Sequence, residues 1–314
     1  MQMERERVLR DVTFWLRPDF VVRCLRRFQA LEGFDRAVAL ASLTFCALVP
    51  LGIVTSGVLS DRDAGAQLVD RFGLKGEGAR AVSELFARGD DLTSGFSLFS
   101  IFLLIVTILS FSRALQRLFE RAWQLEPLSV RNTKNGLVWV AGLVVYSTVA
   151  GFVRTSFDSG VMEVVTAALL CALGLAFVIW TGTTLTNRRV TRSQLLPAGI
   201  LVVAIGVILG IGGDIYVPRL FNSYASRYGA VGSVFAMISW LFIVMVALVA
   251  AVAVGREVWA ELQAIRRGDR PSNEQIEADW AQVRAQMDEG RTQVAERTRA
   301  ARERFASRRG DRRR

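Results

Sequence analysis

The chain has 314 residues, of which 52% are hydrophobic, and a formal net charge of +10 at pH 7. It contains no histidine and only three cysteines, so the commonest general base is missing, and no CxxC pair offers a zinc site or a disulfide framework. The apolar residues concentrate in runs of about 18 or more, the length that a helix needs to cross a membrane. These features favour a polytopic membrane protein over a soluble enzyme, and we expect neither a metal nor another cofactor.

The N-terminal segment, residues 1–33, is basic, and we expect it to be a cytoplasmic or interfacial amphipathic segment. We expect no signal peptide, because no short apolar core with a small-residue cleavage site follows Met1. Four apolar residues of the segment fall near one face of a helix: Phe20, Cys24, Phe28 and Leu31. Two interpretations stay open, a helix in the plane of the lipid headgroups or a cytoplasmic helix packed on the floor of a helical bundle.

Six apolar spans follow and predict an all-helical membrane domain over residues 34–258. In chain order they lie at about 37–59, 94–112, 136–153, 160–183, 195–213 and 232–254. Only a few residues separate the third span from the fourth, so these two should form a tight helical hairpin. The connection at 60–93 has helical periodicity, which leaves open whether it covers the outer mouth of the bundle or is a solvated connector.

Basic residues gather in alternate loops. Residues 1–36 hold eight arginines, and the loops at 113–135 and 184–194 are also basic. Since cytoplasmic loops of membrane proteins carry the excess of Lys and Arg, six spans place both termini in the cytoplasm. We therefore expect a multi-pass protein of the bacterial cytoplasmic (inner) membrane.

Helix-breaking residues occur inside two of the spans and form a candidate kink or groove: Pro50, Pro197, Gly206 and Gly210. A proline frees a backbone carbonyl, and a glycine lets helices approach closely. These residues either serve packing alone or make the fifth helix flexible beside a groove. Charged residues lie near the span ends, which disfavours a proton relay at the midplane but is compatible with a path for a polar headgroup.

The stretch before the sixth span carries a candidate headgroup or interface site made of Tyr224, Ser226, Arg227 and Tyr228. The two tyrosines are typical of aromatic anchors at the membrane surface. Alternatively, Arg227 supplies the charge and the three hydroxyls supply hydrogen bonds for a specific lipid headgroup. Gly229 is predicted to give a tight re-entry into the membrane.

The C-terminal tail, residues 259–314, is predicted to be cytoplasmic, basic, partly helical and partly disordered. Ser272 and Gln275 form a capping-box pattern after Pro271. A short heptad-like seam follows, made of Ile276, Trp280, Val283 and Met287, and the chain then ends in an arginine-rich run. The tail favours contact with anionic lipid, and a homo-oligomer or a protein partner through it stays open, while nucleic acid is disfavoured.

Three stretches together resemble the YihY/BrkB family of bacterial inner-membrane proteins. They are FDRAVALASLTFCALVPLGIV, FSRALQRLFERAWQL with Trp123, and LLPAGILVVAIGVILGIGGDIYV followed by YASRYGAVGSVFAMISWLFIVMVALVAAVAVGREVWAEL. The resemblance covers roughly residues 15–265 and implies an integral membrane protein of the cell envelope. The chain departs from the family's GAE pattern, because Glu257 is displaced by one position, about 100° around a helix. No family role is therefore carried over to Glu257.

Members of the family have also been labelled ribonuclease BN. A hydrolytic nuclease needs metal carboxylates or an acid–base pair, and this chain offers no histidine and no acidic cluster facing the cytoplasm. We therefore expect no enzyme, and we expect instead a protein that acts on membrane lipids as a lipid or amphiphile transporter. The alternative is a scaffold that does not transport and recruits a partner through its basic tail, with a ribonuclease third.

Overall fold

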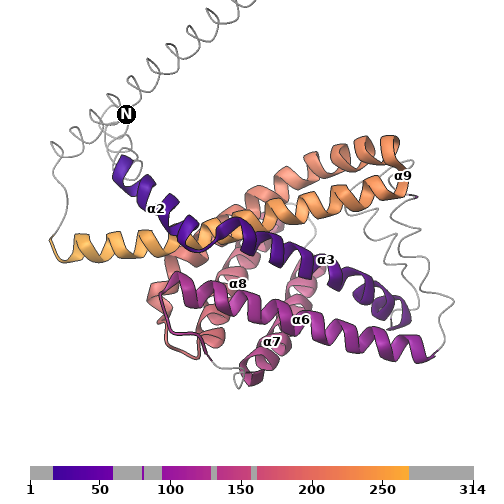
Figure 1. The fold of residues 1–314 in the computed structure, drawn as a ribbon, viewed down its shortest axis with the longest axis horizontal. Coiled ribbons are helices and arrows are strands. Elements are labelled where there is room, and N and C mark those ends of the chain that lie inside the picture. The colour runs from indigo at the N-terminus through magenta and orange to yellow at the C-terminus, as the bar shows by residue number, and fades with distance from the viewer. Residues whose placement is uncertain (1–16, 59–79, 81–93, 129–132, 157–160, 269–314) are drawn as a thin grey trace, which may run out of the picture. The chain divides into compact units, whose positions relative to one another are not determined.

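The computed structural model describes residues 17–58, 80, 94–128, 133–156 and 161–268 (Figure 1). These residues form helices and contain no strand, which confirms the predicted all-α class for the described part of the chain. The helices are α2 (Pro18–Ala30), α3 (Gly33–Val58), α6 (Ser94–Ala122), α7 (Thr133–Ser156), α8 (Val161–Leu185) and α9 (Arg192–Arg266). The predictions for the 60–93 connection, Arg80 apart, and for the tail beyond residue 268 lie outside the described residues.

The described residues belong to two compact units, one containing residues 17–26 and 261–268 and the other residues 27–260. In the first unit, Glu261 is 5% exposed and receives two arginines. Arg23 Nη2 lies 2.5 Å from Glu261 Oε2, and Arg17 pairs with the other carboxylate oxygen. The predicted N-terminal helix therefore exists and is tied to the start of the predicted tail. Its place in the headgroup plane stays a prediction, as do the predicted domain boundaries.

Five helical segments of the described residues are long and apolar enough to cross a membrane. They are Phe99–Ala122, Lys134–Arg154, Val164–Leu185, Arg192–Gly229 and Val231–Arg266. Helix α3 occupies the first predicted span, but the side chains of its second half lie outside the described residues. The structure thus supports several membrane-crossing helices, and the count of six spans stays a prediction.

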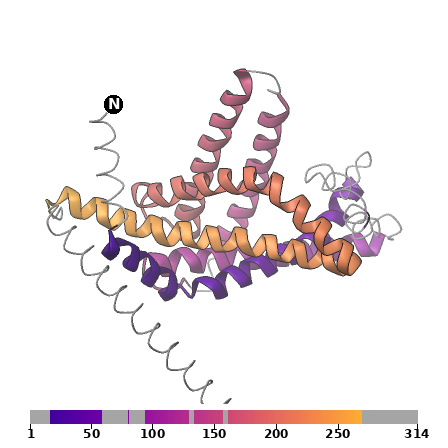
Figure 2. The same ribbon diagram turned by 90° about the horizontal axis from the view of Figure 1, so that it is seen from above.

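Helix α9 consists of two arms that reverse direction at Gly229, which has φ 61° and ψ −141° (Figure 2). This conformation is essentially restricted to glycine, so the reversal falls at the residue that the sequence indicates. The arms run over Arg192–Gly229 and Val231–Arg266. The sequence predicts that the first arm ends near residue 213, and this is wrong, because the helix continues through Pro218 to the reversal.

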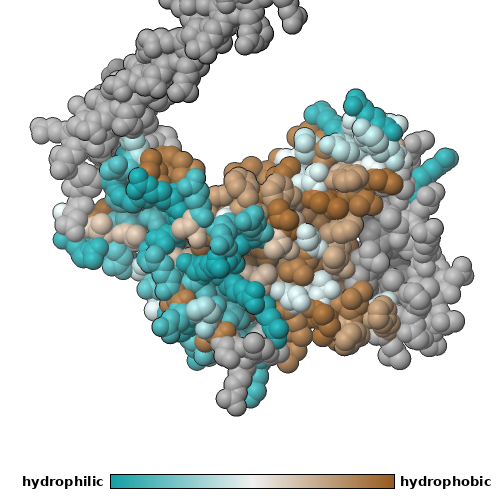
Figure 3. All heavy atoms as spheres, in the orientation of Figure 1, coloured by the Kyte–Doolittle hydropathy of each residue, from teal (hydrophilic) through white to brown (hydrophobic). Residues whose placement is uncertain are grey.

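In the larger unit, the end of α6 meets the start of α3, and the end of α8 meets the start of α7. Arg121 Nη1 near the end of α6 lies 2.6 Å from Glu32 Oε2 just before α3. Asn135 Nδ2 near the start of α7 donates to the carbonyl of Thr184 near the end of α8, at 3.0 Å. We call residues 31–36, 113–128, 134–136 and 185–192 the charged end. Hydrophilic residues gather at this end, and hydrophobic residues cover much of the visible remainder (Figure 3).

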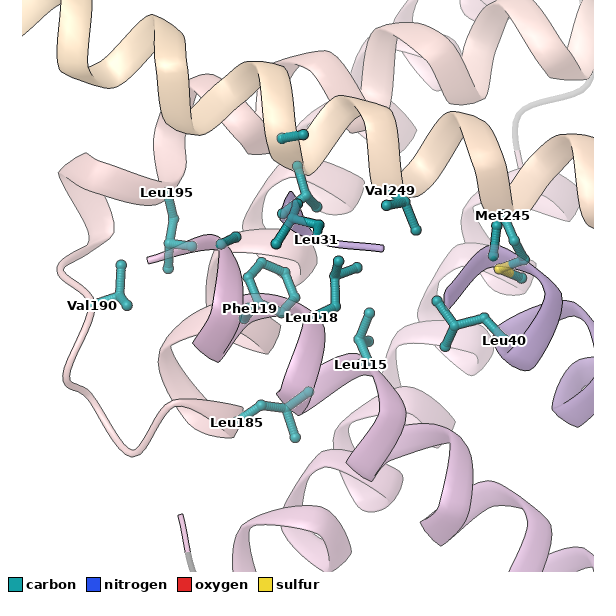
Figure 4. Close-up of a cluster of buried hydrophobic side chains, with 14 of the residues drawn as sticks. Leu31, Leu40, Leu115, Leu118, Phe119, Leu185, Val190, Leu195, Met245 and Val249 are labelled. Carbon is teal, nitrogen blue, oxygen red and sulfur yellow. The ribbon is translucent and has the colours of Figure 1, made fainter. Parts of the chain in front are cut away.

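The buried apolar core also lies at the charged end (Figure 4). It joins Leu40 of α3, Leu118 of α6, Leu185 of α8 and both arms of α9 through Leu195 and Val249, each at most 1% exposed. Apolar side chains elsewhere on the helices remain exposed, as expected for surfaces that meet lipid. The packing that fixes the helices therefore concentrates beside the basic loops.

Candidate functional site

Two helix ends at the charged end are closed by the same type of cap. At the end of α6, Leu125 N donates to Glu120 O at 2.8 Å and Gln124, with φ 54°, is left-handed. At the end of α8, Arg188 N donates to Thr183 O at 2.7 Å and Asn187, with φ 54°, is left-handed. Both are Schellman motifs, with a left-handed residue just past the helix. They turn the chain sharply and direct Arg189 back toward α6.

Glu120 is a buried carboxylate, 2% exposed, held by three donors. Its Oε1 accepts hydrogen bonds from Arg189 Nη2 at 3.0 Å, from Gln116 Nε2 at 2.8 Å and from the backbone N of Leu128 at 3.1 Å. Arg189 also donates to the carbonyls of Thr186 and Glu126. Since a buried charge is stable only when it is paired and hydrogen-bonded, this network fixes the α8–α9 connection against α6.

A second buried carboxylate of the larger unit, Glu257, lies in the second arm of α9 and is 6% exposed. Arg27 Nε donates to its Oε1 at 2.7 Å. The sequence interpretation assigned no role to Glu257 and did not single out Glu120. The available signal was the four-residue spacing of Gln116 and Glu120, which places the two polar side chains on the same face of α6.

A pocket of about 430 Å³ lies between α3, α6 and α7. Its lining is predominantly apolar and consists of Leu43, Thr44, Ala47, Leu104, Ile108, Phe111, Trp139, Leu143, Val144, Ser147 and Thr148. The volume falls within the range of about 300–1,000 Å³ that is usual for sites of small ligands. Val144 is 60% exposed and Ser147 and Thr148 are also exposed, so the pocket opens sideways on the surface of α7.

Most polar groups in the lining are bound within the protein. Thr44 Oγ1 donates to Leu40 O at 2.8 Å, and Thr148 Oγ1 donates to Val144 O at 2.9 Å. Trp139 Nε1 donates to Thr181 Oγ1 at 3.0 Å, which leaves the indole ring as an apolar wall. A ligand in this pocket therefore meets hydrocarbon and aromatic surface, and the lining suits an acyl chain better than a polar solute.

The residues of the predicted headgroup site lie together in the last two turns of the first arm of α9. Tyr224 and Tyr228 are 37% and 65% exposed, with their ring centroids 6.5 Å apart. The Ser226 hydroxyl donates to Ser223 O at 3.1 Å, and Arg227 is exposed. These residues do not line the pocket. Whether they anchor the helix or hold a headgroup stays a prediction.

The four residues of the predicted kink or groove are spread over two helices. Pro50 lies within α3, and its side chain is outside the described residues. Pro197 is buried near the start of α9, while a Cβ added at Gly206 or Gly210 would meet nothing within 4 Å. None of them lines the pocket between α3, α6 and α7, and their role stays a prediction. Across the described ranges, no group of three or more Cys, Asp or Glu could hold a metal ion.

The family described as "Virulence factor BrkB" matches residues 24–277. Proteins named "UPF0761 membrane protein" from Xanthomonas campestris pv. campestris, Xanthomonas axonopodis pv. citri and Xanthomonas oryzae pv. oryzae are each 22% identical over 260 residues. The alignments cover 77% of this chain and 60% of each relative, so the chain spans less than two thirds of their length. No solved structure matches.

Proposed function

Since the chain belongs to the BrkB family, we propose that it is a membrane protein that binds the acyl chain of a lipid or another amphiphile and transfers the molecule across the bilayer. The observation that carries this proposal is the apolar pocket between α3, α6 and α7, which opens sideways at Val144. A solute channel would need polar groups along its path. Here Thr44 and Thr148 hydrogen-bond their own helices instead.

The surroundings of the pocket support access from lipid. On α7, the neighbouring residues Val145 and Phe152 are 62% and 70% exposed. Lipid tails are as apolar as the exposed side chains of a membrane-crossing helix, so the two can lie in contact. An acyl chain can therefore pass from the bilayer into the pocket without crossing water. The pocket requires no ionisable group, which agrees with the near absence of charge from the centres of the spans.

We further propose that the charged end faces the cytoplasm of a bacterial inner membrane, with both termini on that side. The basic loops at 113–135 and 184–194 support this orientation. The proposed activity involves no covalent chemistry, and we assign no catalytic residue. A scaffold that recruits a partner through its basic tail is the outcome expected if purified protein moves no lipid.

Replacing Ala47 with Trp should lower the rate at which proteoliposomes translocate a fluorescent phospholipid to about a tenth of the wild-type value, ~1.4 kcal/mol on the barrier. The indole would fill pocket volume from the α3 side. Ser147→Trp fills it from α7 and keeps the test independent of packing within α3. A quencher is added outside the proteoliposomes, and the measurement is the rate at which fluorescence is lost as labelled lipid moves from the inner to the outer leaflet.

The matched control is Ala204→Trp, because Ala204 is exposed on α9 and does not line the pocket. It should translocate lipid at the wild-type rate. Equal slowing by Ala47→Trp, Ser147→Trp and Ala204→Trp would indicate that the lipid does not pass through the pocket. Wild-type protein that moves lipid no faster than protein-free liposomes would rule out transport and leave the scaffold alternative.

A further inference from the structure

One exposed face of α6 is apolar in its first half and basic in its second half. The apolar part lies on the surface, with Phe102 63% and Val106 43% exposed. The basic part consists of the exposed Arg113, Arg117 and Arg121. Arg113 follows Val106 by seven residues, about two helical turns, and the two remaining arginines follow at four-residue steps, so all five side chains share one stripe.

This α6 stripe is separate from the pocket. Ile108 lines the pocket and stands two residues, about 200° around the helix, from Val106 on the stripe. The two surfaces therefore lie on nearly opposite sides of α6. A ligand on the stripe does not compete with a ligand in the pocket.

The basic half of the stripe carries more positive than negative charge. Arg117 makes no hydrogen bond or ion pair with any described residue, and it acts on the nearby Arg36 as a like charge. Glu32 is shared between Arg121 at 2.6 Å and Arg36 at 3.6 Å, and Asp35 is the other carboxylate in this part of α3. Among the described residues of this region, the guanidinium groups of Arg36, Arg117 and Arg121 therefore outnumber the carboxylates of Glu32 and Asp35, and Glu120 on α6 pairs with Arg189 instead.

The electrostatic surroundings of Arg36 reflect this imbalance. Burial and the like charge of Arg121 lower the pKa of Arg36 from its ordinary value, Glu32 acts in the opposite direction, and Arg117 lowers it further. The Nε of Arg36 donates a hydrogen bond to the carbonyl of Leu31, at 2.7 Å. A negatively charged ligand at the stripe would relieve the repulsion between these guanidinium groups, and phosphate oxygens match the geometry of arginine donors.

The length of the stripe fits one leaflet of a bilayer. Phe102 and Arg113 are eleven residues apart, about 16 Å along a helix. Half of the hydrocarbon thickness is about 15 Å. We infer that the α6 stripe binds a single anionic phospholipid, with its phosphate on Arg113, Arg117 and Arg121 and an acyl chain along Val106 and Phe102. This inference does not depend on lipid transport through the pocket.

The test is native mass spectrometry of the detergent-purified protein after addition of phosphatidylglycerol or, in parallel, phosphatidylcholine. The double variant Arg113→Gln/Arg117→Gln should bind phosphatidylglycerol about tenfold more weakly, ~1.4 kcal/mol. The control Arg154→Gln/Arg219→Gln removes two exposed arginines from other helices and should retain wild-type binding. Binding of phosphatidylglycerol to the wild type should also weaken as salt is raised, because exposed charges are screened.

Unchanged phosphatidylglycerol binding in Arg113→Gln/Arg117→Gln would overturn the inference. An equal loss in both double variants would also overturn it, since that result indicates general attraction to a basic protein. Equal binding of phosphatidylcholine and phosphatidylglycerol by the wild type would exclude an anionic site. None of these results bears on translocation in the Ala47→Trp experiment, so the two proposals fail separately.

Discussion

Arg189→Met should lower the free energy of unfolding by about 3 kcal/mol, the low end of the range for breaking a buried ion pair. The substitution keeps a long apolar stem and removes the guanidinium that faces Glu120. The Glu120 carboxylate would then remain buried with only Gln116 and a backbone N–H as donors. The low end applies because the Arg189 side chain is itself 29% exposed. Thermal unfolding in detergent measures the effect.

Arg121→Met is the matched control. Arg121 forms a shorter contact than Arg189, 2.6 Å against 3.0 Å, but both Arg121 and its partner Glu32 are at least half exposed. Exposed ion pairs contribute only about 0–1 kcal/mol, so this variant should unfold close to the wild type. The double variant Glu120→Gln/Arg189→Met should recover part of the lost stability, because no charge is then left buried. Equal melting temperatures for Arg189→Met and Arg121→Met would show that the ion pair between Glu120 and Arg189 does not stabilise the fold.

Gly255→Ala should lower the free energy of unfolding by about 1–3 kcal/mol or more, the range for an overpacked interior. An ideal Cβ at Gly255 would lie 2.2 Å from the Cα and 2.5 Å from the Cβ of Ala198. These two atoms lie in the opposite arm of α9, and neither a Cα nor a Cβ moves when a side chain changes rotamer. No rotamer change therefore relieves the clash. The arms would have to separate at the charged end, which the melting temperature in detergent would report.

Gly206→Ala tests whether the loss comes from the helix crossing. Gly206 also lies inside α9, but a Cβ there would meet nothing within 4 Å. Alanine is the better helix former by about 0.5–1 kcal/mol, so this variant should be neutral or slightly stabilised. Similar losses of stability in Gly255→Ala and Gly206→Ala would indicate that glycine makes α9 flexible. The close approach of Gly255 to Ala198 would then not explain the loss.

The sequence was sufficient for the helical class, for the order of the helices and for the reversal at Gly229. Hydrophobic run length and glycine backbone freedom are local properties, so they can be read without knowing what each helix contacts. The helical stretch from Asp214 to Tyr228 was missed because its polar and aromatic residues resemble a loop. The structure places Pro218 inside this helical stretch. A proline within a membrane helix is accommodated when its neighbours satisfy the freed carbonyl.

The buried ion pairs and the pocket could not be predicted, because each depends on residues far apart in the sequence. Glu120 and Arg189 are brought together by two helix caps at Gln124 and Asn187, neither of which is a glycine. Among apolar residues within spans, a lining residue such as Ala47 cannot be distinguished from one that meets lipid, since both environments favour the same side chains. The candidate residues from 224 to 228 were chosen by composition alone, and because composition does not reveal partners, their role stays a prediction.

Photocrosslinking tests most directly whether the pocket between α3, α6 and α7 holds an acyl chain. A phospholipid with a diazirine in mid-chain is irradiated with the protein in liposomes, and the labelled peptides are identified by mass spectrometry. If the pocket holds the chain, label should concentrate on residues 43–47, 104–111 and 143–148 and be lost from them in Ala47→Trp. Label that follows exposure alone, favours Val164 and Ile208 at 72% and 67% exposed, and is unchanged in Ala47→Trp would show that the pocket does not hold it.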